Sequence, residues 1–197
     1  MPAVPSGCAG RRVRHGQQGE APGYHTRPIA CPAPPVTRLV RIDIAKEAMN
    51  FSAAHFTIFS ATERENLHGH NFRLGCAVTA PVGDDGLCFD YAIIKRKLKA
   101  LCDTLDERML LPAHSPHLRV EHDDAEVRAH YAGELLRFLP RDVIVLPVAN
   151  ITVEALSGYF LALMLDDPQF AGLPIHALEV RVSSGSGQWG ISEWTRG

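Results

Sequence analysis

Apolar and polar residues alternate between residues 39 and 44, and a period of two is typical of a half-buried strand. The alternation resumes over residues 49–55 in the opposite phase, so that Phe51 and His55 share a face. A change of phase inside an extended segment indicates an extra residue or a bend. We therefore expect two strands in succession, separated by a bulge or bend near residues 46–48.

A second alternating run follows a polar segment at residues 56–67, which we interpret as a loop. The face of this run that carries His68 and His70 continues with apolar residues, so the histidines stand at one end of a core-facing row. The sequence Gly-Asp-Asp-Gly at residues 83–86 is a turn signal between two apolar segments. This pattern predicts that residues 69–90 form a hairpin or near-hairpin.

Two later segments have the spacing of amphipathic helices. Asp90 stands where an N-cap belongs, ahead of helical spacing over residues 94–105. Thr152 takes the same place before a second helix with inward apolar residues over 156–164. Alternation returns over residues 177–182 and predicts a late strand. Together these elements predict an α+β fold, an antiparallel sheet with two main helices packed on one face.

The same patterns divide the chain into two parts, the second of which carries an insert. Residues 1–36 are rich in Pro, Gly, Arg and Ala without any period, which predicts a disordered N-terminal extension or a start codon assigned too early. Residues 37–197 are then one domain. Within it, alternating residues on both sides of Ala132 and Gly133 predict a hairpin inside an inserted segment at residues 112–149.

Composition narrows the class of protein. The net charge of -2 with mixed signs gives no electrostatic footprint for nucleic acid, and no apolar run approaches the roughly 20 residues that span a bilayer. The N-terminus lacks the apolar segment of a secretory signal. The five cysteines are an odd number without disulfide-like spacing, as expected of reduced thiols. We therefore expect a cytoplasmic protein without a nucleic-acid or membrane partner.

Three histidines carry the candidate chemistry. His68 and His70 are two residues apart, so on a strand they point to the same face at a spacing of about 7 Å. The neighbouring strand that ends at His55 could add a third imidazole and leave a fourth position open, as in catalytic zinc sites. The alternative is that these are partly buried histidines of a sheet. Three further histidines in a polar loop are ordinarily solvated, with metal binding the alternative: His114, His117 and His122.

At these residues the chain resembles the 6-pyruvoyltetrahydropterin synthase and 6-carboxytetrahydropterin synthase family. The segments that match in order and spacing are Phe51–His55, Leu67–Asn71, Leu105–Asp106 and Asn150–Glu154. The match covers roughly residues 38 to 194 without the insert, and its histidine signature is the specific part. The resemblance implies the tunnelling fold, a homohexamer built from two trimers, and active sites at subunit interfaces.

The resemblance also implies roles for single residues. His55, His68 and His70 would bind Zn2+, and the substrate would be 7,8-dihydroneopterin triphosphate. Zinc in an open site can act as a Lewis acid toward the substrate hydroxyls, while a base takes a proton and a partner returns one. Either triphosphate leaves or the side chain is cleaved, and both are lyase reactions. Thr152 and Glu154 are retained and are candidates to bind the pterin ring.

The position of the family's cysteine, four residues before His68, is Arg64, which cannot act as a base. Glu65 stands beside it, as in a variant branch where glutamate replaces the cysteine and the product is 6-hydroxymethyl-7,8-dihydropterin. Glutamate can serve as the base if burial or a neighbouring charge raises its pKa. The alternative is a surface loop residue, paired with Arg64.

Two further positions depart from the family pattern. Glu107 follows Asp106 where histidine is expected, so it either exchanges a proton in its place or simply caps the first helix. Ser184 aligns with a glutamate that grips the pterin ring, and a hydroxyl cannot match two parallel N–H donors. Three functions stay open: a zinc-dependent pterin lyase, an enzyme for a related triphosphate or ring, and a metal-binding oligomer without turnover.

Overall fold

The computed structural model describes residues 38–197, so the predicted disordered extension at residues 1–36 lies outside the described residues. In chain order the elements are β1 (Leu39–Ile44), β2 (Asn50–His55), β3 (His68–Pro81), α1 (Ala92–Leu105), β4 (Arg108–Pro112), β5 (Arg119–His122), β6 (Val127–Tyr131), β7 (Glu134–Phe138), η1 (Pro140–Asp142), β8 (Val143–Leu146), α2 (Val153–Leu165), α3 (Pro168–Ala171), β9 (Ala177–Ser183) and β10 (Gly190–Thr195). None of the helices within residues 38–197 is long and apolar enough to cross a bilayer.

A seven-stranded sheet forms the main layer, in the order β10-β9-β3-β2-β4-β8, with β1 also paired to β3. The long strand β3 is its centre: β9 lies along one edge, while β1 and β2 follow one another along the other. Residues 45–49 stand opposite only two residues of β3, since Ile44 pairs with Cys76 and Asn50 with Arg73. The predicted bend is confirmed here, as an interruption wider than a single-residue bulge.

The sheet is mixed rather than wholly antiparallel. β4 pairs in parallel with β2 and with β8, whereas the ladders of β3 with β1, β2 and β9 are antiparallel. The predicted hairpin over residues 69–90 is wrong. Residues 83–86 do turn, with Gly86 at a φ of 79°, but the chain then enters α1, and β3 takes the upstream strand β1 as its antiparallel partner.

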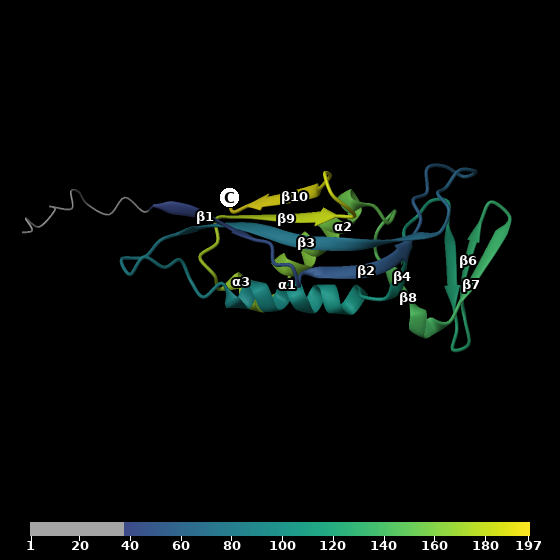
Figure 1. Cartoon of the computed structure of the whole chain (residues 1–197), viewed down its shortest axis with the longest axis horizontal. Helices are drawn as coiled ribbons and strands as arrows, with labels where there is room; N and C mark the ends of the chain where they lie inside the picture. Colours follow the sequence, from purple (N-terminus) through teal and green to yellow (C-terminus); the bar gives the residue numbers. More distant parts are fainter. Residues whose placement is uncertain (1–37) are drawn as a thin grey trace, which may run out of the picture. The chain divides into compact units, whose positions relative to one another are not determined.

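Both main helices cover the same face of the sheet, as predicted (Figure 1). α1 contacts β2 and β3, while α2 contacts β9 and β10. Thr152 is confirmed as the N-cap of α2. α1 begins at Ala92 with Tyr91 at the cap position, so Asp90 is not the N-cap, although its carboxylate accepts a hydrogen bond of 2.9 Å from the Ala92 N–H. The core between sheet and helices includes the fully buried Phe51, Phe72, Leu74, Leu98, Leu156 and Phe160.

The predicted hairpin between the two main helices is confirmed. β6 and β7 pair around Ala132 and Gly133, which both have positive φ, and β5 adds a third strand. This small sheet lies beyond the end of β2 (Figure 1). A second core packs against it, made of Phe56, Ile58, Met109, Leu111, Leu118, Val127, Ala129 and Tyr131. Later in the segment 112–149, β8 belongs to the main sheet.

Candidate metal centre and active site

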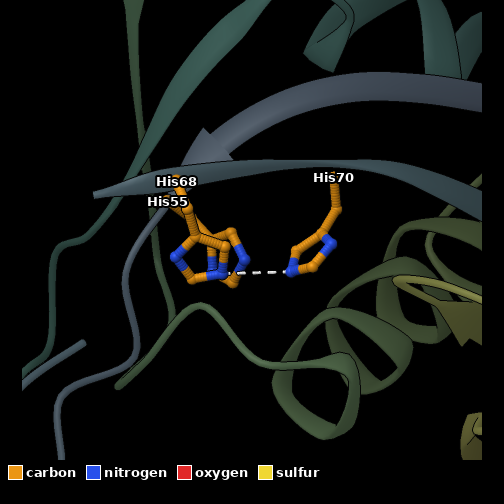
Figure 2. A group of neighbouring side chains, drawn as sticks. All are labelled: His55, His68 and His70. Carbon is orange, nitrogen blue, oxygen red and sulfur yellow. Dashed lines mark hydrogen bonds between the residues drawn. The ribbon is translucent and has the colours of Figure 1, made fainter. Parts of the chain in front are cut away.

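The three histidines predicted as ligands lie together where β2 ends and β3 begins. His55 pairs with His68 across the ladder and His70 lies opposite Ala53, so the three side chains share one face of the sheet. The ring centroid of His68 lies 4.7 Å from that of His55 and 4.8 Å from that of His70. Figure 2 shows the rings extending from the strands toward the segment that leads into α2. One ring nitrogen of each lies within 4.8 Å of the others.

Backbone carbonyls fix two of these imidazoles. Nδ1 of His55 lies 3.0 Å from the carbonyl oxygen of Ile151, and Nδ1 of His68 lies 2.8 Å from that of Asn66. A carbonyl oxygen can only accept, so both Nδ1 atoms must donate, and both Nε2 atoms of the neutral rings keep a lone pair. A ligand histidine is oriented in the same way, because its second nitrogen donates to a carbonyl or carboxylate.

The Nε2 atoms meet the requirements of a metal ion. Nε2 of His55 is buried without a hydrogen-bond partner, and the residue is only 5% exposed. Nε2 of His68 and Nε2 of His70 lie 3.0 Å apart. Burial lowers the pKa of His55, and the charge of His68 lowers it further, which favours the neutral ring that a metal requires. One ring nitrogen from each of three histidines, all within 4.8 Å of one another, is a ligand set that fits a divalent ion such as zinc.

Glu65 supplies a carboxylate beside the histidines. Its Oε2 lies 3.9 Å from Nε2 of His68 and accepts a hydrogen bond of 2.9 Å from the Thr57 N–H. Burial raises the pKa of Glu65, but the hydrogen bonds from Thr57 and the nearby histidine charges outweigh it, so the net pKa is lowered. The raised pKa expected of a glutamate base is therefore not found. Arg64 donates to the backbone oxygen of Glu65, and its ion pair is with Glu134.

Asn150 connects the start of α2 to the loop that carries Glu65. Its side-chain amide accepts a hydrogen bond of 3.1 Å from the N–H of Ile58 and donates one of 2.8 Å to the carbonyl of Ile58. The amide thus pairs with the loop as a neighbouring strand would. Sequence reasoning assigned Asn150 no role, and its place in the Asn-x-Thr-x-Glu segment was the available signal.

The residues predicted to bind the ring lie at the start of α2. The Thr152 hydroxyl accepts a hydrogen bond of 3.3 Å from the Ala155 N–H, so the cap already uses this oxygen. Glu154 follows in the first turn and is exposed, where the helix dipole favours a carboxylate. Both residues come directly after Ile151, whose carbonyl holds His55, so this end of α2 borders the cluster.

Asp106 and Glu107 are not brought to the histidines of the same chain. Asp106 follows α1, and its Oδ1 accepts a hydrogen bond of 2.7 Å from the Ser52 N–H. Glu107 has a φ of 56°, a left-handed conformation that commonly ends a helix, and its N–H donates to the Ser52 carbonyl. Glu107 lines a surface pocket with Ser52, Ala54 and Gly69. Ser52, Ala54 and Gly69 alternate with the histidines along β2 and β3, so the pocket lies on the other side of the sheet.

The remaining sequence candidates lie elsewhere. Within residues 38–197, the three histidines described above form the only group of at least three His, Cys, Asp or Glu residues arranged to hold a metal ion. His114, His117 and His122 are therefore not gathered into a second site. Ser184 lies in the loop between β9 and β10, where its hydroxyl accepts a hydrogen bond of 3.4 Å from Gln188.

Comparison with known proteins identifies a family and a curated relative with similar sequences. The family model described as 6-pyruvoyl tetrahydropterin synthase matches residues 43–191. A curated protein of Methanocaldococcus jannaschii, named "Putative 6-carboxy-5,6,7,8-tetrahydropterin synthase", is 30% identical over 142 residues, covering 71% of this chain and 86% of that protein.

Solved structures of similar proteins share the fold. The 6-pyruvoyl tetrahydropterin synthase of Plasmodium falciparum is similar with a TM-score of 0.74 and 28% identity, covering 80% of this chain and 99% of that one. The corresponding Plasmodium vivax structure has a TM-score of 0.75 and 24% identity, covering 81% and 99%. The expected tunnelling fold is therefore confirmed, with the corrections to strand direction given above.

Proposed function

This chain belongs to the 6-pyruvoyl tetrahydropterin synthase family, and we propose that it is a zinc-dependent lyase acting on 7,8-dihydroneopterin triphosphate or a close analogue in the cytoplasm. His55, His68 and His70 are the proposed zinc ligands. One observation carries the proposal: the buried Nε2 of His55, which has no hydrogen-bond partner, faces two further imidazole nitrogens that lie 3.0 Å apart. Such a set of nitrogens suits a catalytic ion, because three protein ligands leave room for a substrate.

The bound ion would supply Lewis acidity to the hydroxyls of the substrate side chain, which lowers the cost of removing a proton there. The residues of the chain hold the site ready for this. The Nδ1–H groups of His55 and His68 donate to carbonyls and keep both rings oriented. Glu65 is the proposed proton acceptor, because its carboxylate oxygen lies 3.9 Å from Nε2 of His68, within reach of a substrate bound at the cluster.

Glu154 is the better of the two proposed ring-binding residues. Its carboxylate is exposed beside the cluster and can accept two parallel N–H bonds from an amino-pyrimidine edge. The Thr152 hydroxyl is already used in the helix cap, so we assign it the positioning of that first turn. Ser184 in place of the family's glutamate favours a related ring as the second candidate substrate.

Purified, zinc-loaded protein incubated with 7,8-dihydroneopterin triphosphate tests the function, with products identified by chromatography and mass spectrometry. We expect consumption of the substrate and a fall in kcat of about 10²-fold or more in Glu65→Gln. Glu63→Gln is the matched control, because Glu63 is exposed in the same loop. Tight zinc binding without consumption of this substrate or an analogue would favour the metal-binding oligomer, and unchanged turnover in Glu65→Gln would overturn its role as the base.

We also propose a homohexamer with active sites at subunit interfaces. Asp106 and Glu107 would then serve the histidine cluster of a neighbouring subunit, which accommodates their place away from the histidines of their own chain. Light scattering measures the assembly. Mixing inactive Glu65→Gln and Glu107→Gln proteins under conditions of subunit exchange should restore activity, since some mixed interfaces carry both intact residues. No restoration after verified exchange would contradict this arrangement.

A further inference from the structure

The loop that carries Glu65 is bonded to Asn150 on one side and packs against the small sheet on the other. Phe56 and Ile58 at its start are 1% and 7% exposed, and they pack in the same core as Tyr131 of β6. The hydroxyl of Tyr131 also donates a hydrogen bond of 3.0 Å to the carbonyl of Ser60, near the middle of the loop. Contacts with the hairpin therefore hold this loop at two places.

Arg64 makes a third connection between the loop and the hairpin. Its guanidinium carbon lies 5.0 Å from the ring centroid of Phe56 and 5.6 Å from that of Tyr131, within the range of a cation–π contact. One terminal nitrogen donates a hydrogen bond of 2.7 Å to Glu134 at the start of β7, and the other donates one of 2.8 Å to the backbone oxygen of Glu65. The side chain is only 17% exposed, so most of it is held between loop and hairpin.

We propose that Arg64 is a positioning residue that fixes Glu65 beside the three histidines by fastening its backbone to the β6–β7 hairpin. The guanidinium donates hydrogen bonds to both the Glu65 carbonyl and the Glu134 carboxylate. The Glu65 carboxylate accepts a hydrogen bond from the Thr57 N–H and lies 3.9 Å from Nε2 of His68. Arginine suits this place because its planar fork can bind two acceptors and stack on rings at once.

A role for the hairpin follows from this. His55, His68 and His70 lie on paired strands of the main sheet, and the ladder between these strands holds their backbones without Arg64. We expect Glu65 to depend more strongly on Arg64, because the guanidinium joins the Glu65 backbone to the hairpin. The inference rests on the proposed function for the role of Glu65 as the base, whereas the anchoring itself stands on the contacts alone.

Three single variants of the full-length protein test the anchoring. Arg64→Met keeps an unbranched apolar stem and removes both hydrogen bonds, and Glu134→Gln weakens only the outer bond. Glu126→Gln is the matched control, since Glu126 pairs with Arg128 and Arg137 inside the small sheet. Hydrogen exchange with mass spectrometry follows the amides of residues 57–65, and the visible absorption of added Co2+ reports the histidine geometry.

In Arg64→Met we expect exchange over residues 57–65 to rise about tenfold or more, because two hydrogen bonds and the ring contacts are lost together. Glu134→Gln should give a rise of at most about fivefold, since an exposed ion pair is weak. Glu126→Gln should give none, and all three variants should still bind Co2+. Unchanged exchange in Arg64→Met, or loss of Co2+ binding in it, would overturn the proposal.

A double-variant cycle on turnover of 7,8-dihydroneopterin triphosphate separates positioning from general stability. If Arg64 acts through Glu65, Arg64→Met lowers kcat about tenfold in the wild-type background and has no further effect in Glu65→Gln. Equal losses in both backgrounds would show that Arg64 acts elsewhere. A wild-type protein without turnover would end the proposed function, and the exchange measurements would still decide whether Arg64 orders the loop.

Discussion

Adding zinc should stabilise the folded protein, and the structure sets the size of the effect. Nitrogens of His55, His68 and His70 lie within 4.8 Å of one another on two paired strands, so binding requires little rearrangement. A metal that binds only the folded state, at a free concentration of 100 times its Kd, adds about 2.7 kcal/mol to the free energy of unfolding. In a domain of about 150–250 residues each kcal/mol raises Tm by about 2–4 °C. The expected rise is therefore about 5–11 °C.

Scanning calorimetry of EDTA-treated protein, titrated with zinc chloride, measures this rise. His68→Gln removes one ligand and should abolish most of the zinc-dependent change, because two remaining nitrogens bind the ion far more weakly. His68 is better suited than His55 to this substitution, since His55 is buried and His68 is only half-buried. His117→Gln is the matched control, because His117 is exposed and outside the cluster, and it should keep the full rise.

Two results would refute this reasoning. The first is a wild-type Tm that zinc leaves unchanged, which would mean that the three imidazoles do not form a site. The second is an equal rise in wild type and His68→Gln, which would place the stabilising ion elsewhere. Isothermal titration calorimetry should also give one zinc ion per chain. Loss of this binding in His68→Gln would show that the thermal effect comes from the histidine cluster.

Gly190→Ala should lower the free energy of unfolding by about 1–3 kcal/mol in a urea titration, because its Cβ would clash with the backbone oxygen of Val153 at the start of α2. Gly185→Ala should be nearly neutral, since its Cβ would meet nothing within 4 Å, and equal losses in the two variants would contradict this account. Thr152→Ala should cost about 1 kcal/mol through loss of the N-cap bond, and Thr152→Ser should retain most of it. Cys76 and Cys102 should resist alkylation near pH 8 until the protein unfolds, because burial raises the pKa of each to about 12. Peptide mass spectrometry would show rapid labelling of either cysteine in the folded protein if this is wrong.

Features that depend on local periodicity could be predicted from the sequence. The alternation around Phe51 and Phe72 placed both rings on the buried face, where they stack with centroids 5.0 Å apart. The change of phase between β1 and β2 was visible because a period of two registers a single inserted residue. Thr152 was identifiable as a cap because its hydroxyl acts on the next turn of the same helix.

Features that depend on strand pairing between distant segments were not predictable in this way. The turn at residues 83–86 is real, but no local signal excludes the upstream strand β1 as the partner of β3. β4 is an apolar run buried on both faces, so it has no alternation and its parallel pairing with β8 stayed hidden. Arg64 could be interpreted only as a missing base or as a surface partner of Glu65, because its partners Tyr131 and Glu134 lie about 70 residues further along the chain.

The candidate site combines residues from two parts of the fold, the histidines on the main sheet and Glu65 on the loop between β2 and β3. The histidines extend the buried row of β3, beside Phe72, so the packing of sheet and helices holds them. Glu65 stands on a loop that is held by the second core, by Arg64 and by Asn150. Because Arg64 binds the backbone of Glu65 and none of the three histidines, loss of its contacts should displace the carboxylate more than the imidazoles. Substitution of Arg64 should therefore lower turnover more than it lowers metal affinity.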